Sequence, residues 1–326
     1  MRRFFSLLFS LALLAVITGG ALLYYGQQQF EAPGPATAML EIDIPAGSGL
    51  NAIASRLERA GAIDSADIFR LGTRFKKAER SLKAGEYEIA AGASMADILA
   101  QLQTGKTIER RVTVPEGLTS LQVVAILDAT EKLTGEIDAI PVEGSLAPET
   151  YFFTTGETRA AILARMQTAQ TEIIDTLWEG RAPDLPFDTK AEALALASIV
   201  EKETGVSSER AKVAGVFVNR LNKGMRLQSD PTVIYGIAGG KGLDRPIRRS
   251  DLKDQNAYNT YVISGLPPTP IANPGRAAIE ATLNPEATTD FYFVADGTGG
   301  HAFARTLNEH NRNVRKWRKI EAERAD

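Results

Sequence analysis

Two glutamates in the last turn of one predicted helix have the side-chain type and the spacing for proton-transfer chemistry. The apolar pattern predicts this helix over 191–203, so it includes both Glu201 and Glu203. The helix face that carries Glu203 also carries three aliphatic side chains: Leu196, Ile199 and Val200. Glu201 shares its face with a smaller and more mixed set: Leu194, Ala197 and Ser198. We therefore expect Glu203 to point inward with its aliphatic neighbours.

A carboxyl group in that position has two reasons for a raised pKa. Burial against aliphatic side chains disfavours its charged form, and so does the negative end of the helix dipole. A carboxyl group that stays protonated at neutral pH can act as the general acid in glycosidic bond cleavage. Most glutamates at helix ends have no chemical role, however, so the pattern alone favours ordinary charges at both Glu201 and Glu203.

The composition excludes several other kinds of site. The 326 residues contain no cysteine, which excludes disulfides, thiol nucleophiles and thiolate metal sites. His301 and His310 are the only histidines, so a multi-histidine metal site is excluded, a carboxylate site stays open, and no cofactor is expected. A net charge of −3 without a basic patch among aromatics argues against nucleic acid as a partner. The basic run over 312–319 is expected to be a solvated helix face.

The elements that must position the two glutamates begin with an apolar N-terminus. From Phe4 to Tyr25, 22 residues pass without Asp, Glu, Lys or Arg. At about 1.5 Å per residue, such a helix can cross a hydrocarbon core of roughly 30 Å. Arg2 and Arg3 precede it, so the positive-inside rule places the N-terminus in the cytoplasm and the rest outside. The alternative is a cleaved signal peptide, but the long apolar stretch and the lack of an A-x-A site favour a retained anchor over 1–30.

A stiff linker is expected over 31–37, and a repeated pattern follows it over 38–130. In three units a glycine turn is followed by apolar residues six and ten positions later: Gly47 with Ile53 and Leu57, Gly92 with Ile98 and Leu102, and Gly117 with Val123 and Leu127. The pattern predicts short strand–turn–helix pieces that form one or two small α+β modules. A repeat by itself shows no function, so we expect a binding or spacer module.

A mixed α/β region is expected over 131–326. Thr189 and Glu192 fit a capping box that begins the helix with the two glutamates. A second amphipathic helix is expected at about 208–223, and a β-hairpin is expected over 291–303. These elements would surround a loop-rich stretch that contains many glycines and prolines.

Polar and aromatic residues in and around this stretch are candidates for contact with a substrate. The candidates are Asn219, Gln228, Asp230, Tyr235, Asn259, Tyr261 and His301. Asp230 also fits a helix N-cap followed by Pro231, with Gly236 ending that short helix. The tyrosines and His301 are equally typical of packed residues beside turns.

Several motifs occur together and in order in the second half of the chain. They are Ala197-Ser-Ile-Val-Glu-Lys-Glu203-Thr, Asn219-Arg-Leu, Gly224-Met-Arg-Leu-Gln228, Asp230-Pro-Thr-Val, Tyr258-Asn-Thr-Tyr261, Gly265-Leu-Pro-Pro268, Phe291-Tyr-Phe-Val-Ala-Asp296-Gly and Gly300-His301-Ala-Phe303. Together they resemble the endolytic murein transglycosylases, also called YceG-like proteins. The first half is similar more loosely, through its single apolar helix and Val114-Pro-Glu-Gly117.

The resemblance implies an α+β fold with an N-terminal transmembrane helix, a small LysM-like βα-repeat region over 38–130, and a mixed α/β catalytic domain over 131–326. It implies a single-pass protein of the inner membrane, with a cytoplasmic N-terminus and a periplasmic catalytic domain. Such a lytic transglycosylase cleaves the bond between N-acetylmuramic acid and N-acetylglucosamine within glycan strands. It leaves 1,6-anhydro ends and terminates or releases nascent strands.

The resemblance also assigns the catalytic residue. The catalytic glutamate of the family is the second one of the Glu-Lys-Glu run, which falls on Glu203 and agrees with the independent argument from the helix face. The implied partners are peptidoglycan strands and cell-wall synthases such as penicillin-binding proteins. One departure is visible, because the family commonly has Phe-Pro-Asp-Thr-Tyr where this chain has Ala147-Pro-Glu149-Thr-Tyr151, and the role of Glu149 therefore stays open.

Two rival functions stay open. A muramidase-type hydrolase would use Glu203 with a second carboxylate, for which Glu149, Glu209 and Asp230 are candidates. A non-catalytic scaffold would bind glycan through the repeat region. The mass of the product ends distinguishes the hydrolase, and replacement of Glu203 distinguishes the scaffold.

Overall fold

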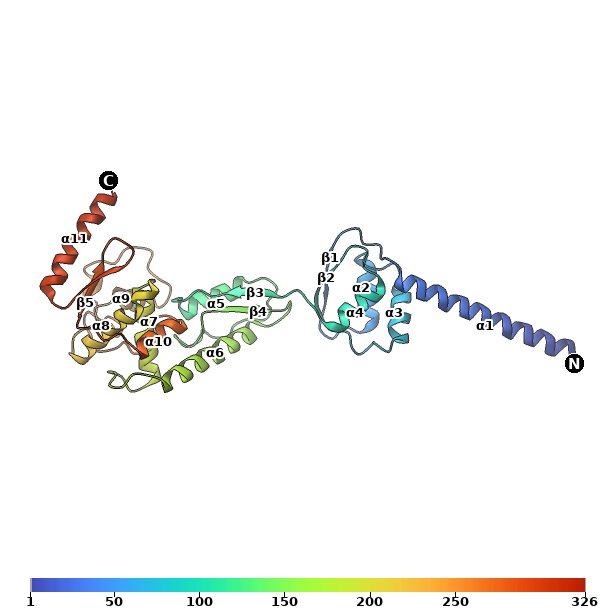
Figure 1. Cartoon of the computed structure of the whole chain (residues 1–326), viewed down its shortest axis with the longest axis horizontal. Coiled ribbons are helices and arrows are strands. Elements are labelled where there is room, and N and C mark those ends of the chain that lie inside the picture. Colours follow the sequence, from blue (N-terminus) through green and yellow to red (C-terminus); the bar gives the residue numbers. More distant parts are fainter. Residues whose placement is uncertain (1, 326) are drawn as a thin grey trace. The chain divides into compact units, whose positions relative to one another are not determined.

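The computed structural model describes residues 2–325, with side chains described from Phe9 to Arg324. The chain divides into two compact units (Figure 1). Unit 1 comprises Met1–Arg110 and Phe152–Gly156, and unit 2 comprises Arg111–Tyr151 and Glu157–Asp326. Both units combine helices with short antiparallel sheets, in agreement with the mixed fold class that the sequence predicts.

Unit 1 begins with α1 (Arg2–Glu31), a single continuous helix. Its segment Phe9–Glu31 is the one helical stretch among the described residues that is long and apolar enough to cross a membrane. The predicted apolar helix is therefore present and is compatible with single-pass anchoring. It extends beyond the expected apolar stretch, which ended at Tyr25.

The rest of unit 1 is a small helix-and-strand module. Strand β1 (Leu40–Ile44) pairs antiparallel with β2 (Gly85–Ile89), and the chain between them forms α2 (Leu50–Arg59) and α3 (Ala66–Phe75). Helix α4 (Met95–Thr104) follows β2. The largest fully buried side chains in this unit come from these five elements and from the loop between α2 and α3: Ile44, Leu57, Ile63, Phe69, Tyr87, Ile89, Ile98, Leu99 and Leu102.

The three glycines of the repeat form the predicted turns. Gly47, Gly92 and Gly117 have φ angles of 79°, 68° and 75°, a left-handed conformation that favours glycine. The third turn leads into α5 (Ser120–Ala129) in unit 2, so the expected domain boundary at residue 130 falls inside that unit. The physical reason is a contact between distant parts of the chain, because Gly117 N donates to the Asn273 carbonyl oxygen at 3.1 Å.

Four helices form the core of unit 2 (Figure 1). They are α6 (Arg159–Glu179), α7 (Lys190–Glu203), α8 (Arg210–Asn222) and α10 (Arg276–Leu283). Thr189 and Glu192 form the predicted capping box of α7, because the Thr189 hydroxyl accepts from Glu192 N and Glu192 accepts from Thr189 N. Strands β3 (Arg110–Thr113) and β4 (Thr150–Phe153) form a separate two-stranded sheet.

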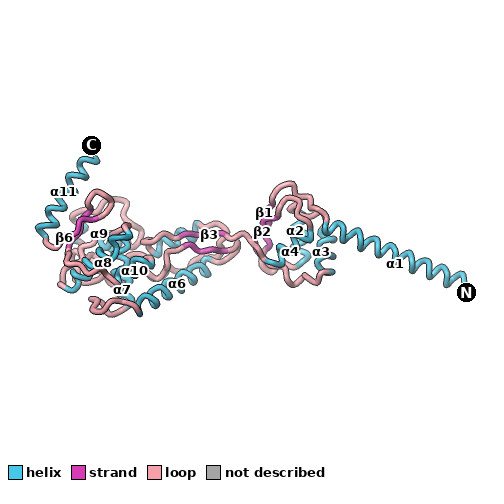
Figure 2. Tube along the Cα trace, in the orientation of Figure 1, coloured by secondary structure: helices cyan, strands magenta, loops and turns pink. Residues whose placement is uncertain are grey.

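The loop-rich stretch contains the short helix α9 (Asp230–Ala238), where the structure corrects two expectations (Figure 2). Ser229, not Asp230, is the N-cap residue. Gly236 lies inside the helix, which ends at Gly239 with a φ of 58°. Glycine at 236 allows close packing instead, since a Cβ there would lie 2.3 Å from Asn256 Oδ1. A 3-10 turn at Asp251–Lys253 follows in the same stretch.

The C-terminal part contains the predicted hairpin. Strand β5 (Tyr292–Ala295) pairs antiparallel with β6 (His301–Ala304), and Ala295 lies opposite His301. Helix α11 (Leu307–Ala325) follows, and its basic side chains over 312–319 are exposed as expected.

Candidate active site

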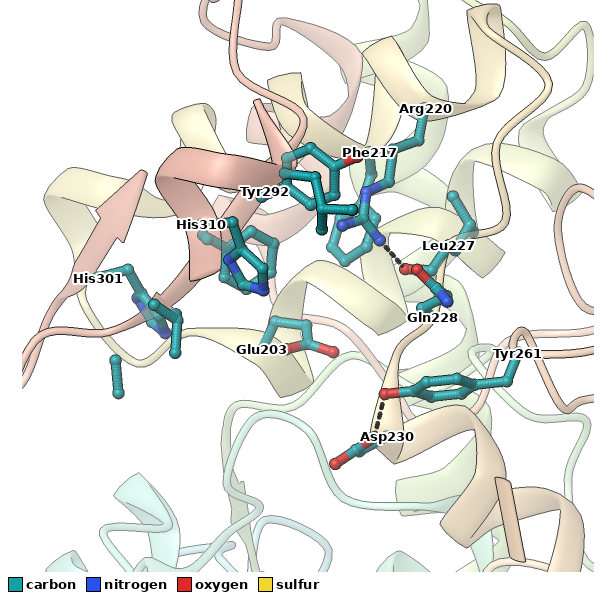
Figure 3. Close-up of a pocket in the computed structure, with 14 residues that line it drawn as sticks. Glu203, Phe217, Arg220, Leu227, Gln228, Asp230, Tyr261, Tyr292, His301 and His310 are labelled. Atoms are coloured by element: carbon teal, nitrogen blue, oxygen red, sulfur yellow. Dashed lines mark hydrogen bonds between the residues drawn. The ribbon is translucent and has the colours of Figure 1, made fainter. Parts of the chain in front are cut away.

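A pocket of about 500 Å³ in unit 2 contains Glu203. Its walls come from the end of α7, from α8, from the loops before α9 and before Tyr261, from the β5–β6 hairpin and from the start of α11. In Figure 3, Glu203 lies between His301 on the hairpin side and Tyr261 with Asp230 on the loop side. Of the predicted contact residues, the pocket brings four together with Glu203: Gln228, Asp230, Tyr261 and His301.

Glu203 is the last residue of α7, and its helix face is buried as expected. Leu196, Ile199 and Val200 are all 0% exposed. The Ser229 hydroxyl donates to Glu203 Oε1 at 2.6 Å. Burial raises the pKa of Glu203 and the nearby Asp230 carboxylate adds to this effect, while the Ser229 hydrogen bond, His301 and Arg220 oppose it.

Glu201 differs from Glu203 in its partners. On its helix face, Ala197 and Ser198 are also 0% exposed, whereas Leu194 is half-buried. Helix α10 packs on α7 there, and Gly275 N, at the N-cap of α10, donates to Glu201 Oε2 at 2.8 Å. Burial raises the pKa of Glu201 as well. Glu201 therefore caps a neighbouring helix, whereas Glu203 faces the pocket.

Arg220 also lines the pocket, although it is not among the predicted contact residues. Its side chain is buried, and its Nε and Nη1 donate to the carbonyl oxygens of Phe291 and Leu227, each at 2.6 Å. The guanidinium also lies over the Tyr292 ring, 5.3 Å from its centroid. A signal was available in the sequence, because Arg220 continues the apolar face of α8 three residues after Phe217.

His301 is held by Glu209, which belongs to the 3-10 turn Ser207–Glu209 before α8. The Nδ1 atom of His301 lies 2.7 Å from Glu209 Oε2, and His301 N donates to Glu209 Oε1 at 3.0 Å. The Phe293 ring packs edge-on against the imidazole at 5.3 Å. With Nδ1 engaged, Nε2 is the ring nitrogen left for a ligand in the pocket.

The loop side of the pocket is held by hydrogen bonds. The Tyr261 hydroxyl donates to Asp230 Oδ1 at 2.6 Å, and the pKa of Tyr261 is raised by burial and by this hydrogen bond. Asn259 is fully buried, and its Oδ1 accepts from Tyr261 N at 3.0 Å. Gln228 has a φ of 51°, a left-handed conformation that is uncommon for a residue with a side chain.

Three predicted contact residues do not line this pocket. Asn219 donates to the carbonyl oxygens of Thr288 and Asp290 at 2.8 and 3.0 Å. The Tyr235 hydroxyl donates to Glu143 Oε2 at 3.1 Å. Asn259 lies behind Tyr261. Each of these side chains therefore holds a loop or helix of unit 2 in place.

His310 is a second pocket residue that was not selected. Its ring stacks on Tyr292 at 5.2 Å, and burial together with Arg220 lowers its pKa, which favours the neutral imidazole. Among the described residues, its buried Nδ1 has no hydrogen-bond partner. The composition drew attention to His310 only as a possible metal ligand. Within residues 2–325, no group of three or more His, Asp or Glu side chains is placed to hold a metal ion.

The candidates for a second carboxylate lie in different places. Asp230 lines the pocket but accepts from Tyr261, and Glu209 accepts twice from His301. Glu149 is exposed and does not line the pocket. The pocket therefore contains one buried carboxyl group, Glu203, whose partners leave it facing the cavity.

Comparisons with known proteins agree with this arrangement. The model of the YceG-like family matches residues 42–316. The chain is 33% identical to the endolytic murein transglycosylase of Bacillus subtilis (strain 168), over 93% of this chain and 91% of that protein. It is 30% identical to the endolytic murein transglycosylase of Streptococcus pneumoniae serotype 2 (strain D39 / NCTC 7466), over 93% of this chain and 63% of that protein.

A solved structure is also similar. The crystal structure of a yceG-like protein from Listeria monocytogenes is 31% identical and has a TM-score of 0.51, covering 85% of this chain and 99% of that one. The match to the family model spans most of the chain, including Glu203 and the whole pocket around it. The chain therefore belongs to the YceG-like family.

Proposed function

We propose that this protein is an endolytic peptidoglycan transglycosylase that cleaves the bond between N-acetylmuramic acid and N-acetylglucosamine within glycan strands. The observation that carries the proposal is the position of Glu203, a carboxyl group with a raised pKa that faces an open pocket. The relatives named as endolytic murein transglycosylases support the substrate class.

The reaction needs one group that first gives and then takes a proton. Protonated Glu203 donates its proton to the glycosidic oxygen as the bond from that oxygen to C1 of the muramic acid breaks. The resulting carboxylate then accepts the proton of the C6 hydroxyl as O6 bonds to C1. This closes the 1,6-anhydro ring and returns Glu203 to its protonated form, so no water is consumed.

The surroundings of Glu203 suit both protonation states. Burial favours the protonated carboxyl group before the reaction, whereas the Ser229 hydroxyl and the nearby Arg220 and His301 stabilise the carboxylate formed during it. Gln228, Asp230, Tyr261 and His301 line the same cavity, and we assign them to the binding and orientation of sugars. Tyr261 presents a ring surface, and Asp230 and Gln228 can hydrogen-bond sugar hydroxyl groups.

A muramidase is the second candidate, because Asp230 lies in the same pocket. In such an enzyme a second carboxylate would activate water or attack C1. The hydrogen bond from Tyr261 to Asp230 favours the transglycosylase, since it occupies one oxygen of that carboxylate.

The N-terminal half suggests how the enzyme is placed. We assign α1 to a single inner-membrane anchor with a cytoplasmic N-terminus, followed by a linker over 31–37. We assign the part of unit 1 that follows the linker, up to Arg110, to a LysM-like binding or spacer module, and unit 2 to the periplasmic catalytic domain, which would work beside cell-wall synthases. The strand–helix–helix–strand order of Leu40–Ile89 supports the LysM-like assignment.

The test is mass spectrometry of the products that purified full-length protein in detergent forms from uncrosslinked glycan strands. We expect anhydro-ended fragments that disappear in Glu203→Gln and persist in the matched control Glu201→Gln. Reducing ends, which are heavier by one water, would identify a hydrolase. If neither the unchanged protein nor the Glu201→Gln control cleaves the strands although both are folded, the protein would be a non-catalytic glycan-binding scaffold.

A further inference from the structure

Helix α1 does not stop where its most apolar stretch ends but continues into the core of unit 1. Phe30, one residue before the end of the helix, is 4% exposed, and its ring lies 6.3 Å from that of Phe69 in α3. Gly72 of α3 makes room for it, because a Cβ at this position would lie 2.4 Å from the Phe30 ring. The end of the candidate membrane helix therefore belongs to the hydrophobic core of the module that follows it.

The segment after α1 adds two further ties. Gly34 N donates to the Gly92 carbonyl oxygen at 3.2 Å, and Gly92 N donates to the Ala36 carbonyl oxygen at 2.8 Å. A Cβ at Gly34 would lie 2.3 Å from the Ala93 carbonyl oxygen, so the segment passes close to the turn before α4. The module that follows α1 is therefore fixed to this helix through the Phe30 ring and through the hydrogen bonds to Gly92, and no flexible linker separates them.

A groove of about 530 Å³ runs between α1 and α3. Leu23 and Tyr24 of α1 line it together with Leu71 and Phe75 of α3. Leu71 is 56% exposed and Phe75 is 83% exposed, and with Leu23 and Tyr24 they form one contiguous apolar surface. Because Leu23 and Tyr24 belong to the stretch that can cross a membrane, the α3 side chains that share their groove lie at the depth where α1 leaves the hydrocarbon.

The charges around this groove suit an anionic lipid surface. Residues 66–80 include five basic side chains and two acidic ones: Arg70, Arg74, Lys76, Lys77 and Arg80 with Asp67 and Glu79. Lys76 lines the groove, with its Nζ 5.3 Å from the centroid of the Phe30 ring. Lysine and arginine side chains beside apolar residues reach toward lipid headgroups from the edge of a bilayer.

We propose that α3 is a membrane-docking face, on which Leu71 and Phe75 enter the boundary between headgroups and acyl chains, and the groove between α1 and α3 holds an acyl chain of an anionic phospholipid. The proposal rests on α1 being the membrane anchor. It means that the module after α1 lies on the bilayer surface beside that helix. Because Arg70 pairs with Asp67 and Arg74 with Glu79, the basic side chains placed on the headgroups are those that follow α3: Lys76, Lys77 and Arg80.

The chain contains no cysteine, so single cysteines can be introduced and labelled one at a time. We would label Leu71→Cys and Phe75→Cys with an environment-sensitive fluorophore in the full-length protein. The protein would be reconstituted in vesicles of phosphatidylcholine and phosphatidylglycerol in equal parts. Lipids that carry a nitroxide quencher near the headgroup would then report contact with the interface.

Two control positions make the result decisive. Val16→Cys lies within the candidate span and is 72% exposed, so quenching of its label by lipids with a deep nitroxide establishes that α1 is inserted. Glu88→Cys lies on the exposed face of β2, which Figure 1 shows on the side of unit 1 away from α1. Because all four original side chains are exposed, the substitutions are expected to leave the fold intact.

We expect the labels at Leu71 and Phe75 to be quenched several-fold more strongly than the label at Glu88. Quenching at Val16 together with equal, weak quenching at the other three positions would overturn the docking face while the anchor stands. A blue-shifted label at Phe75 that lipids do not quench would also overturn it, because a protein chain would then fill the groove. An unquenched Val16 would remove the anchor, and the docking face with it.

Discussion

The hydroxyl oxygen of Ser229 lies 2.6 Å from Glu203 Oε1, and it joins the N-cap of α9 to the last residue of α7. This hydrogen bond opposes the effect of burial on the pKa of Glu203. The two residues therefore set the balance between a carboxyl group that can donate a proton and a carboxylate that can take one back.

Ser229→Ala is expected to reduce activity about tenfold. This factor corresponds to the free energy of roughly 1.5 kcal/mol that a hydrogen bond to a charged group contributes. Without the hydroxyl group, the carboxylate formed during the reaction loses a donor, and the pKa of Glu203 rises further. The alkaline limb of the pH–rate profile should therefore move to higher pH as the maximum rate falls. An unchanged limb would show that Ser229 does not act on the acid.

The raised pKa of Glu203 also predicts how native stability depends on pH. Below the ordinary value of 4.5 both folded and unfolded chains are protonated, and Glu203→Gln should change little. As pH rises through the raised folded pKa, the unfolded chain ionises more readily and the native state loses stability. At pH 8 we expect the free energy of unfolding of Glu203→Gln, measured by denaturant titration, to exceed that of the unchanged protein by about 1 kcal/mol. A stability difference between the variant and the unchanged protein that is the same at pH 4 and at pH 8 would contradict this.

Glu201→Ala separates structure from chemistry in the same helix. The substitution removes the acceptor of Gly275 N and leaves a partly buried N–H at the start of α10 unpaired. We expect a loss of about 1–3 kcal/mol in the free energy of unfolding, measured by denaturant titration. The catalytic rate of the folded fraction should stay close to that of the unchanged protein. A loss of rate as large as that of Glu203→Gln would place Glu201 in the chemistry.

Arg220→Lys is expected to be nearly as damaging as Arg220→Met. The guanidinium reaches the carbonyl oxygens of Phe291 and Leu227 at once, which a lysine ammonium group cannot reproduce with the same planar geometry. We expect each variant to lose about 2–4 kcal/mol of stability, together with a fall in activity, because buried carbonyl groups lose their donor. Thermal unfolding and product formation check this, and full rescue by lysine would contradict it.

Gln228→Gly tests a strained position in the pocket. Glycine adopts a φ of 51° without the cost that a side chain incurs, so stability should rise by up to about 1 kcal/mol. Activity should fall, mainly through a higher KM, if the Gln228 side chain contacts sugar. A variant with both unchanged stability and unchanged KM would show that Gln228 is an ordinary turn residue.

Features that depend on neighbouring residues were predictable from the sequence. The turns at Gly47, Gly92 and Gly117 and the hairpin around 296–300 follow from short-range spacing, and the structure has all of them. The inward face of α7 follows from helix periodicity, and this periodicity alone was enough to predict that Glu203 points inward.

Features that depend on distant contacts were not predictable in this way. Ser229 meets Glu203 across 26 positions, and Arg220 meets the Phe291 carbonyl across 71. The burial of the Glu201 face follows from the packing of α10, which no local pattern shows. A prediction from residue type alone therefore included Tyr235, which donates a hydrogen bond to Glu143 and does not line the pocket. It did not include His310, which does line the pocket.

The burial of Phe30 has a practical consequence for anyone who cuts the chain to obtain a soluble enzyme. A truncation placed after the linker, at residue 38, removes a ring from the core of unit 1 and breaks both hydrogen bonds to Gly92. Loss of a buried phenylalanine typically costs about 3–5 kcal/mol. A soluble protein that begins before Gln27 keeps Phe30 in this core. In a shorter protein the module after α1 would be less stable than in the full chain, and measurements on it would not describe the native protein.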